Sequence, residues 1–281
     1  MTKLSISRAW DEAAAVLKRD AGTLYLIAFG LGTLPQLVAG ALLPNGSASG
    51  SGILLALLML ASLAVGVAGS VAITALALGR ENVVGRGLAL GFRRMPSLFA
   101  ASLLLLVAFL ILIAVVGAVA GLTPENAFAA GGQPTPKATL ALLIGLLAAV
   151  LIGARFLLTT PVAAAEGGNP IAILRRSWSL TAGNYGRLLL FLILLAVAGL
   201  VFLFAVMTVS GLIVALTLGP PQPGSTAGFV AGLIVAAANA LFVLIFTVVM
   251  ARVYAQLAGT SGAATAPGAS DAGRDTGSGD A

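Results

Sequence analysis

Two long stretches of this chain contain no charged residue, and each is longer than one membrane crossing requires. No Asp, Glu, Lys or Arg occurs from Ala21 to Gly79 or from Leu188 to Ala251. A helix needs about 20 apolar residues to cross a bilayer, so each stretch has room for two crossings and a connection. Segments rich in Gly, Pro and Ser, LLPNGSASGSG and TLGPPQPGSTAG, mark the two connections.

Two further apolar segments, Ser97–Leu122 and Ala138–Leu158, lie between these stretches and provide one crossing each. The composition agrees, because 59% of the residues are hydrophobic, 9% are charged and the mean hydropathy is +1.10. A soluble domain carries about 25% charged residues. The pattern therefore predicts an all-α integral membrane protein with six transmembrane helices.

The basic residues lie almost entirely on one side of the predicted crossings. Of 15 Lys and Arg residues, Lys137 alone falls in a connection on the opposite side. By the positive-inside rule, both termini are expected in the cytoplasm of a bacterial inner (plasma) membrane. A cleaved signal peptide is the competing interpretation of the N-terminus. Its apolar run starts only after Asp20, however, and Asp11 and Glu12 also precede it, which is not typical of a signal.

The segments that precede the odd-numbered crossings have amphipathic helical spacing. Each places large apolar residues on one face and arginines on the other, as at Ile6 and Trp10, at Val84 and Leu88, and at Leu174 and Trp178. Basic amphipathic helices of this kind lie in the headgroup plane. We therefore expect three cytoplasmic interfacial helices and a weak threefold repeat of one interfacial helix plus two crossings. Residues 1–259 form the transmembrane domain, and the Gly- and Ser-rich segment 260–281 is expected to be a disordered cytoplasmic tail.

The stretch RFLLTTPVAAAEGGNPIAILRRSWSLTAGNYGRLLLF (Arg155–Phe191) resembles a bacterial family named after the membrane domain of glycerophosphoryl diester phosphodiesterases. The similarity lies in an Arg near the end of a crossing, a Pro and an acidic residue, then Arg-Ser-Trp, Leu-Thr and Gly-Asn. The N-terminal SRAWDEAAAVLKRD followed by LPQ, and Tyr254, are similar too. The resemblance implies six membrane helices and no established activity for the membrane part alone. The family's phosphodiesterase activity belongs to a soluble barrel that uses His, and this chain contains no His.

Paired arginines before the fifth crossing are candidates for contact with a lipid phosphate. Arg175 and Arg176 would bind the phosphate, with assistance from Arg187 and from the helix terminus near Asn184. Arg93 and Arg94 form a second pair. The simpler interpretation is a basic flank that sets topology and rests on anionic headgroups without selectivity, with Trp178 as an interfacial anchor.

Arg155 lies near the cytoplasmic end of the fourth crossing, and Glu166 follows eleven residues later, after Pro161. We expect these two side chains to form a structural ion pair that fixes the crossing to the third interfacial helix. An ion-binding or substrate-binding role for Arg155 is the alternative.

Few polar residues lie inside the crossings. Pro35 is expected to kink the first helix, and the neighbouring Gln36 needs a hydrogen-bond partner within the bundle. Asn239 lies in the middle of the sixth helix. Such residues more often join helices by hydrogen bonds than line a polar path as in transporters.

Catalysis finds little support in this sequence. The chain has no Cys and no His, and it has no glycine-rich phosphate loop. We expect no enzyme activity, no cofactor and no metal site. Membrane lipids with anionic headgroups are the expected partners, with no nucleic acid, and homo-oligomers or protein partners are left open. The expected function is a scaffold or modulator at the cytoplasmic leaflet. A transporter or channel component for a small or lipid-like solute is the alternative.

Overall fold

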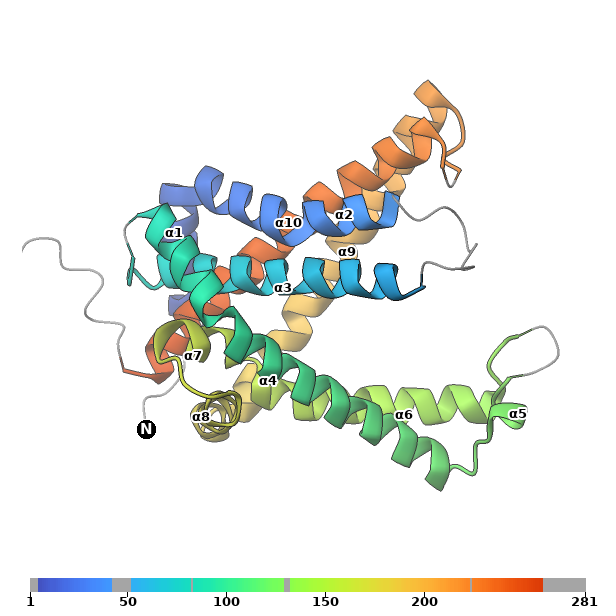
Figure 1. Ribbon diagram of the computed structural model, residues 1–281, viewed down its shortest axis with the longest axis horizontal. Helices are drawn as coiled ribbons and strands as arrows, with labels where there is room; N and C mark the ends of the chain where they lie inside the picture. The colour runs from blue at the N-terminus through green and yellow to red at the C-terminus, as the bar shows by residue number, and fades with distance from the viewer. Residues whose placement is uncertain (1–4, 42–51, 82, 129–131, 223, 260–281) are drawn as a thin grey trace, which may run out of the picture.

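The computed structural model describes residues 5–41, 52–81, 83–128, 132–222 and 224–259. Over these residues the chain is helical, and the one β-bridge joins Phe128 and Pro134. The predicted tail 260–281 lies outside the described residues. The long helices run roughly along one axis of the molecule, and shorter segments gather at its two ends (Figure 1).

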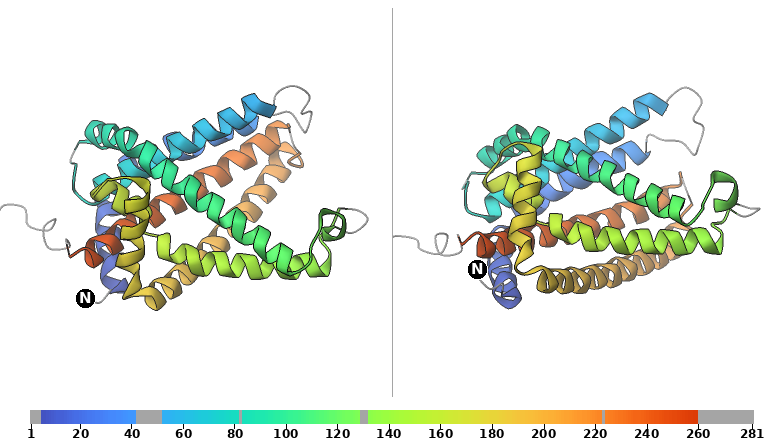
Figure 2. Two further views of the ribbon diagram at one scale, coloured as in Figure 1. Left: turned by 60° about the horizontal axis from the view of Figure 1, so that its bottom comes forward. Right: turned by 90° about the horizontal axis from the view of Figure 1, so that it is seen from below.

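The first helix, α1 (Ile6–Ile27), begins at Ser5, whose side chain accepts a hydrogen bond from the Arg8 amide. It continues without a break into a π-helical segment, η1 (Ala28–Thr33), and then into α2 (Leu34–Ala41). The π-helical turns directly precede Pro35, which lacks the amide hydrogen of a regular helix. The chain changes direction here, because α1 lies across the end of the bundle while α2 runs along it (Figures 1 and 2).

The remaining helices follow in chain order with short connections. They are α3 (Gly52–Ala77), α4 (Val84–Val119), α5 (Pro124–Ala127), α6 (Pro136–Gly153), the 3-10 turn η2 (Ala154–Phe156), α7 (Thr159–Ala165), α8 (Pro170–Ala182), α9 (Tyr185–Leu218) and α10 (Thr226–Leu257). The segment around Val84 and Leu88 is not a separate helix, because α4 continues through Pro96 as one element of 36 residues.

The short helix α8 has the ends that its sequence predicts. Its N-cap Asn169 accepts a hydrogen bond from the Ala172 amide at 2.7 Å, Pro170 occupies the first turn, and the helix ends at Gly183. Figure 1 views α8 end-on, so it lies across the bundle, at the same end as α1.

Within the described residues, six helices are long and apolar enough to cross a membrane, which makes this a multi-pass membrane protein. The six candidate spans are Ile6–Val38, Ala56–Ala77, Val84–Val119, Pro136–Ala165, Tyr185–Leu218 and Thr226–Leu257. Leucine, isoleucine and valine side chains of α4, α6 and α9 are widely exposed. In a bilayer these surfaces face hydrocarbon, where exposed apolar side chains carry no cost.

The best-packed part of the molecule lies at the end where α1, α7 and α8 meet the C-terminal half of α10. Residues 244–256 of α10 are almost all buried there, with Tyr254 2% exposed. We call this end the basic end, because α1, α8, the start of α4 and the end of α10 bring most of the arginines to it. The opposite end carries α5, the start of α6 and Lys137.

Small residues bring α3 close to its neighbours. Gly66 packs against Gly32, and the Ser62 hydroxyl donates a 3.4 Å hydrogen bond to the Pro35 carbonyl. On the other side of α3, Gly91 of α4 lies against the Ala68 carbonyl with no room for a methyl group. Close backbone approach of this kind is how helices associate where water does not drive packing.

Candidate functional site

Glu166, the residue after α7, joins three helices at the basic end. Its Oε1 accepts a 2.8 Å hydrogen bond from the Tyr254 hydroxyl of α10. Both of its carboxylate oxygens accept hydrogen bonds of 3.0 Å from Arg176 Nε of α8. These contacts connect the α7–α8 turn to the last crossing, and we call them the Glu166 junction.

Arg94 of α4 holds the same turn from the other side. Its Nη1 donates to the carbonyl oxygens of Ala163 and Ala164, both at 2.8 Å. These carbonyls belong to the last turn of α7, where no amide of the helix itself can reach them. Gly167 adopts a positive φ of 70°, and a side chain at this position would begin 3.3 Å from the Arg94 guanidinium carbon. Arg94 is therefore a structural residue that closes the C-terminus of α7.

The expected ion pair between Arg155 and Glu166 is wrong. Glu166 pairs with Arg176, and the Arg155 guanidinium instead lies over two aromatic rings. The cause is the buried helix α7, which carries the chain from η2 to the side of α8 where Arg176 lies. The crossing and α8 are nevertheless joined as expected, since Ser177 and Thr181 donate hydrogen bonds of 3.0 and 3.2 Å to the Arg155 carbonyl.

The Arg155 guanidinium lies over two aromatic rings and pairs with no carboxylate of the described residues. Its central carbon lies 5.0 Å from the centroid of the Trp178 ring and 4.3 Å from that of Tyr185. The Tyr185 ring is fixed in turn, because its hydroxyl donates a 2.8 Å hydrogen bond to the Leu151 carbonyl. Within the described part of the chain, the guanidinium N–H groups of Arg155 have no acceptor. Stacking occupies the faces of a guanidinium and leaves the donors at its edge available.

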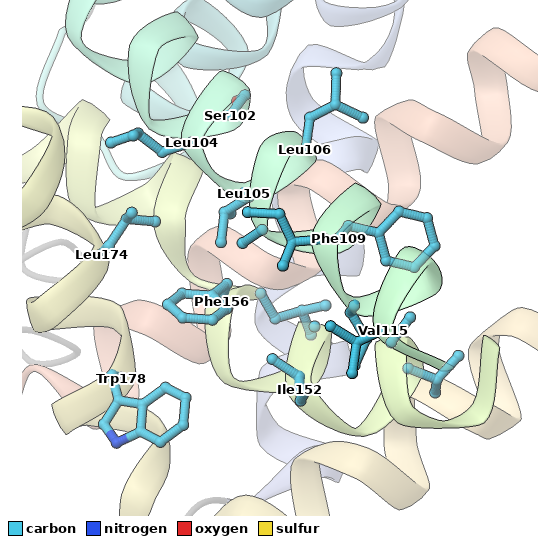
Figure 3. A pocket seen from close by; sticks show the side chains of 17 residues that line it. Ser102, Leu104, Leu105, Leu106, Phe109, Val115, Ile152, Phe156, Leu174 and Trp178 are labelled. Carbon is cyan, nitrogen blue, oxygen red and sulfur yellow. The ribbon is translucent and has the colours of Figure 1, made fainter. Parts of the chain in front are cut away.

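An apolar groove opens beside this stack. It has a volume of about 1050 Å³ and lies between residues 102–115 of α4 and residues 149–157 of α6 and η2, with Leu174 and Trp178 of α8 at one side (Figure 3). Its walls are leucine, isoleucine, valine, alanine and phenylalanine, with Ser102 as a polar exception. We call it the α4–α6 groove. Trp178 belongs to both features, because it lines the groove and stacks on Arg155.

The five arginines expected at a lipid phosphate divide into two kinds. Arg94 and Arg176 are used in the structural contacts described above. Arg93 and Arg175 are exposed, and neither is hydrogen-bonded or ion-paired to a residue that the structure describes. Arg187 is exposed in the first turn of α9, which begins after its N-cap Asn184.

The two polar residues expected inside the bundle lie on its surface. Gln36 of α2 and Asn239 of α10 are exposed, and neither side chain has a hydrogen-bond partner among the described residues. The expected interhelical hydrogen bonds are therefore wrong for this pair. Neither residue lines the α4–α6 groove. The rotation of each helix about its own axis is set by how its small residues pack against neighbouring helices. Residue spacing along one helix does not reveal this rotation.

A second polar cluster, absent from the sequence-based candidates, joins α1 to α10. Gln256 is 8% exposed, and its Oε1 accepts a 3.2 Å hydrogen bond from the Ser5 amide. Gln256 Nε2, Arg252 Nε and Glu12 Oε2 are buried without a partner among the described residues. Two donors and one acceptor of this kind suit a bridging water. The sequence signal is the spacing of four residues between Arg252 and Gln256, which puts both on one helix face.

The chain matches the family model described as a domain of unknown function, DUF7847, over residues 4–257. It belongs to the DUF7847 family. The match covers all six candidate spans, so the Glu166 junction and the α1–α10 cluster lie within the DUF7847 domain. No curated protein and no solved structure matches this DUF7847 chain. The resemblance to the membrane domain of glycerophosphoryl diester phosphodiesterases stays a prediction.

Proposed function

We propose that this DUF7847 protein is a non-catalytic scaffold or modulator of a bacterial inner membrane that contacts anionic lipid at the cytoplasmic leaflet. Its basic end faces the cytoplasm in this proposal, with both termini on that side. The distribution of Lys and Arg supports this orientation, since among the basic residues that the structure describes Lys137 alone falls at the other end of the bundle.

The positions of α1 and α8 support contact with the headgroup layer. Both helices lie across the basic end rather than along the bundle (Figure 2). Trp10 of α1 and Trp178 of α8 are each 46% exposed, as suits indole rings at a membrane interface. The second expected interfacial segment is continuous with the crossing in α4, and α1 runs on through η1 into α2, so α8 is the one of the three that forms a separate helix.

The observation that carries the proposal is the contrast between neighbouring arginines. Arg94 and Arg176 form hydrogen bonds that hold the fold together, while the adjacent Arg93 and Arg175 are exposed and unpaired among the described residues. An exposed arginine at a cytoplasmic leaflet is attracted to anionic headgroups by about 1 kcal/mol. Arginines that the fold does not need are the ones available to lipid.

The test is the anionic lipid that co-purifies with the full chain in mild detergent. R93Q, R175Q and the double variant should each retain less phosphatidylglycerol or cardiolipin than the native chain, with the double variant retaining least. The matched control is K137Q, which removes a positive charge at the opposite end and should retain the native amount. Equal anionic lipid in the native chain and in the double variant would contradict the proposal.

A path for polar solutes is not favoured by the geometry. The α4–α6 groove has apolar walls, and the exposed amides of Gln36 and Asn239 lie outside it. The alternative function is therefore a transporter of a lipid-like solute, and that solute would occupy the same groove.

A further inference from the structure

The α4–α6 groove and the ring contacts of Arg155 share one residue, Trp178. Trp178 lines the α4–α6 groove with one part of its surface and lies 5.0 Å from the Arg155 guanidinium. Phe156 of η2 also lines the groove and packs on Trp178, with ring centroids 5.5 Å apart. The apolar α4–α6 groove thus ends beside the positive charge of Arg155.

We propose that the α4–α6 groove and Arg155 together form a binding site for one anionic glycerophospholipid. An acyl chain lies between α4 and α6, and the phosphate accepts hydrogen bonds from the edge of the Arg155 guanidinium. The inference rests on the proposed function, because it assigns a specific site to the lipid contact proposed above.

The surroundings of the Arg155 guanidinium suit a phosphate ligand better than bulk water. The guanidinium lies over the rings of Trp178 and Tyr185, and its N–H groups find no acceptor among the described residues. A planar guanidinium presents these donors as a pair, which matches two oxygens of a phosphate. A lysine has the charge and lacks this arrangement. Since the rings orient the side chain before ligand arrives, little conformational freedom is lost on binding.

Arg175 supplies a second positive charge on the same side. It lies three residues before Trp178 in α8, and this spacing makes the two side chains neighbours on the helix surface. Leu174 and Trp178 line the groove, while Arg175 is exposed and unpaired within the described residues. Charge is thus concentrated at the end of the groove where a headgroup would lie, and the walls beyond are apolar.

Trp178 allows the site to be observed directly. The chain contains two tryptophans, Trp10 and Trp178, so W10F leaves a single indole in the groove wall. The full-length W10F chain is reconstituted in phosphatidylcholine vesicles that contain a minor fraction of lipid with brominated acyl chains. Bromine quenches indole fluorescence on contact. Brominated phosphatidylglycerol is compared with brominated phosphatidylcholine at the same mole fraction.

The proposal predicts that phosphatidylglycerol binds next to Trp178 about fivefold more strongly than phosphatidylcholine, which corresponds to about 1 kcal/mol for one arginine at an anionic headgroup. R155Q should remove most of this preference, since only the exposed charge of Arg175 then remains beside the groove, and R155K should restore part of it. W178F, which leaves Trp10 alone, should show a much smaller preference, and K137Q should behave as the W10F parent. A108F narrows the groove at α4 and should reduce quenching while leaving Arg155 in place.

Equal quenching by the two lipids would overturn the proposal, because the groove would then hold ordinary bilayer lipid only. A preference that R155Q leaves unreduced would also overturn it, since another residue would then recognise the phosphate. Folding of R155Q is expected, because the substitution keeps the Arg155 carbonyl, which accepts the hydrogen bonds from α8. If that variant nevertheless fails to fold, unreduced quenching in A108F overturns the proposal by itself. If co-purified anionic lipid still falls in the R93Q/R175Q variant, only this site is wrong and the proposed function stands.

Discussion

The hydroxyl of Tyr254 donates a 2.8 Å hydrogen bond to Glu166, 88 positions earlier in the chain. Tyr254 is buried near the end of the last crossing, and Glu166 ends the short helix that follows the fourth. Arg176 completes the junction by donating to both carboxylate oxygens. One carboxylate therefore holds α7, α8 and α10 together at the end where the arginines gather.

Replacing Tyr254 with Phe removes the hydroxyl and leaves the ring in place. A hydrogen bond from a buried hydroxyl to a carboxylate contributes about 1.5 kcal/mol, so Y254F should unfold at a lower temperature in detergent. R176Q should cost less, about 1 kcal/mol or below, because that ion pair is 44% and 35% exposed. R86Q is the control, since Arg86 forms a longer 3.7 Å pair with Glu81. A thermal midpoint for Y254F equal to that of the native chain would contradict the junction.

Adjacent arginines of α4 should respond very differently to the same change. R94Q leaves the Ala163 and Ala164 carbonyls without their donor, and hydrogen bonds to a charged group contribute about 1.5–3 kcal/mol each. We expect R94Q to lower the thermal midpoint clearly and to expose the α7–α8 turn to protease. R93Q removes an exposed charge and should leave both measurements unchanged. Equal effects of the two variants would mean that Arg94 does not close α7.

The contact between α3 and α4 should not tolerate a methyl group at Gly91. A Cβ there would collide with the Ala68 carbonyl, which belongs to backbone and cannot rotate away. Overpacking of this kind costs about 1–3 kcal/mol, so G91A should lower the thermal midpoint. G85A is the matched control on the same helix, because a Cβ there meets nothing within 4 Å. Its better helix propensity should leave stability unchanged or raise it by up to about 1 kcal/mol.

Asn239 and the α10 residue that Tyr25 contacts lie two positions apart, yet Asn239 and Tyr25 should contribute differently to stability. The Tyr25 hydroxyl donates a 3.1 Å hydrogen bond to the Ala237 carbonyl, so Y25F should cost about 0.6 kcal/mol, a typical interhelical value in membranes. Asn239 is exposed and has no partner among the described residues. N239L should therefore keep or raise the thermal midpoint. A lower midpoint for N239L than for Y25F would show that Asn239 joins helices after all.

The number of crossings could be predicted from sequence because charge is so costly in hydrocarbon. The charge-free stretches Ala21–Gly79 and Leu188–Ala251 need no knowledge of packing to be recognised. The start of α8 can also be predicted from sequence, since Asn169 and Pro170 act through local backbone geometry alone.

The side-chain partners at the basic end could not be predicted in the same way. Glu166 was expected to pair with Arg155, and it pairs instead with Arg176, which α7 places beside it. Gln36 was expected to need a partner, yet helix rotation leaves it exposed. The α4–α6 groove also depends on how two helices diverge, which no residue pattern along either helix encodes.

Both proposals depend on which side of the membrane the basic end occupies, and cysteine labelling tests this most directly. The chain contains no Cys, so single exposed cysteines can be introduced at Ala172 of α8 and at Gln133 of the opposite end. Spheroplasts are treated with a membrane-impermeant maleimide before and after lysis. Q133C should react in intact spheroplasts, and A172C should react only after lysis. Labelling of A172C from outside, with Q133C protected until lysis, would contradict the account.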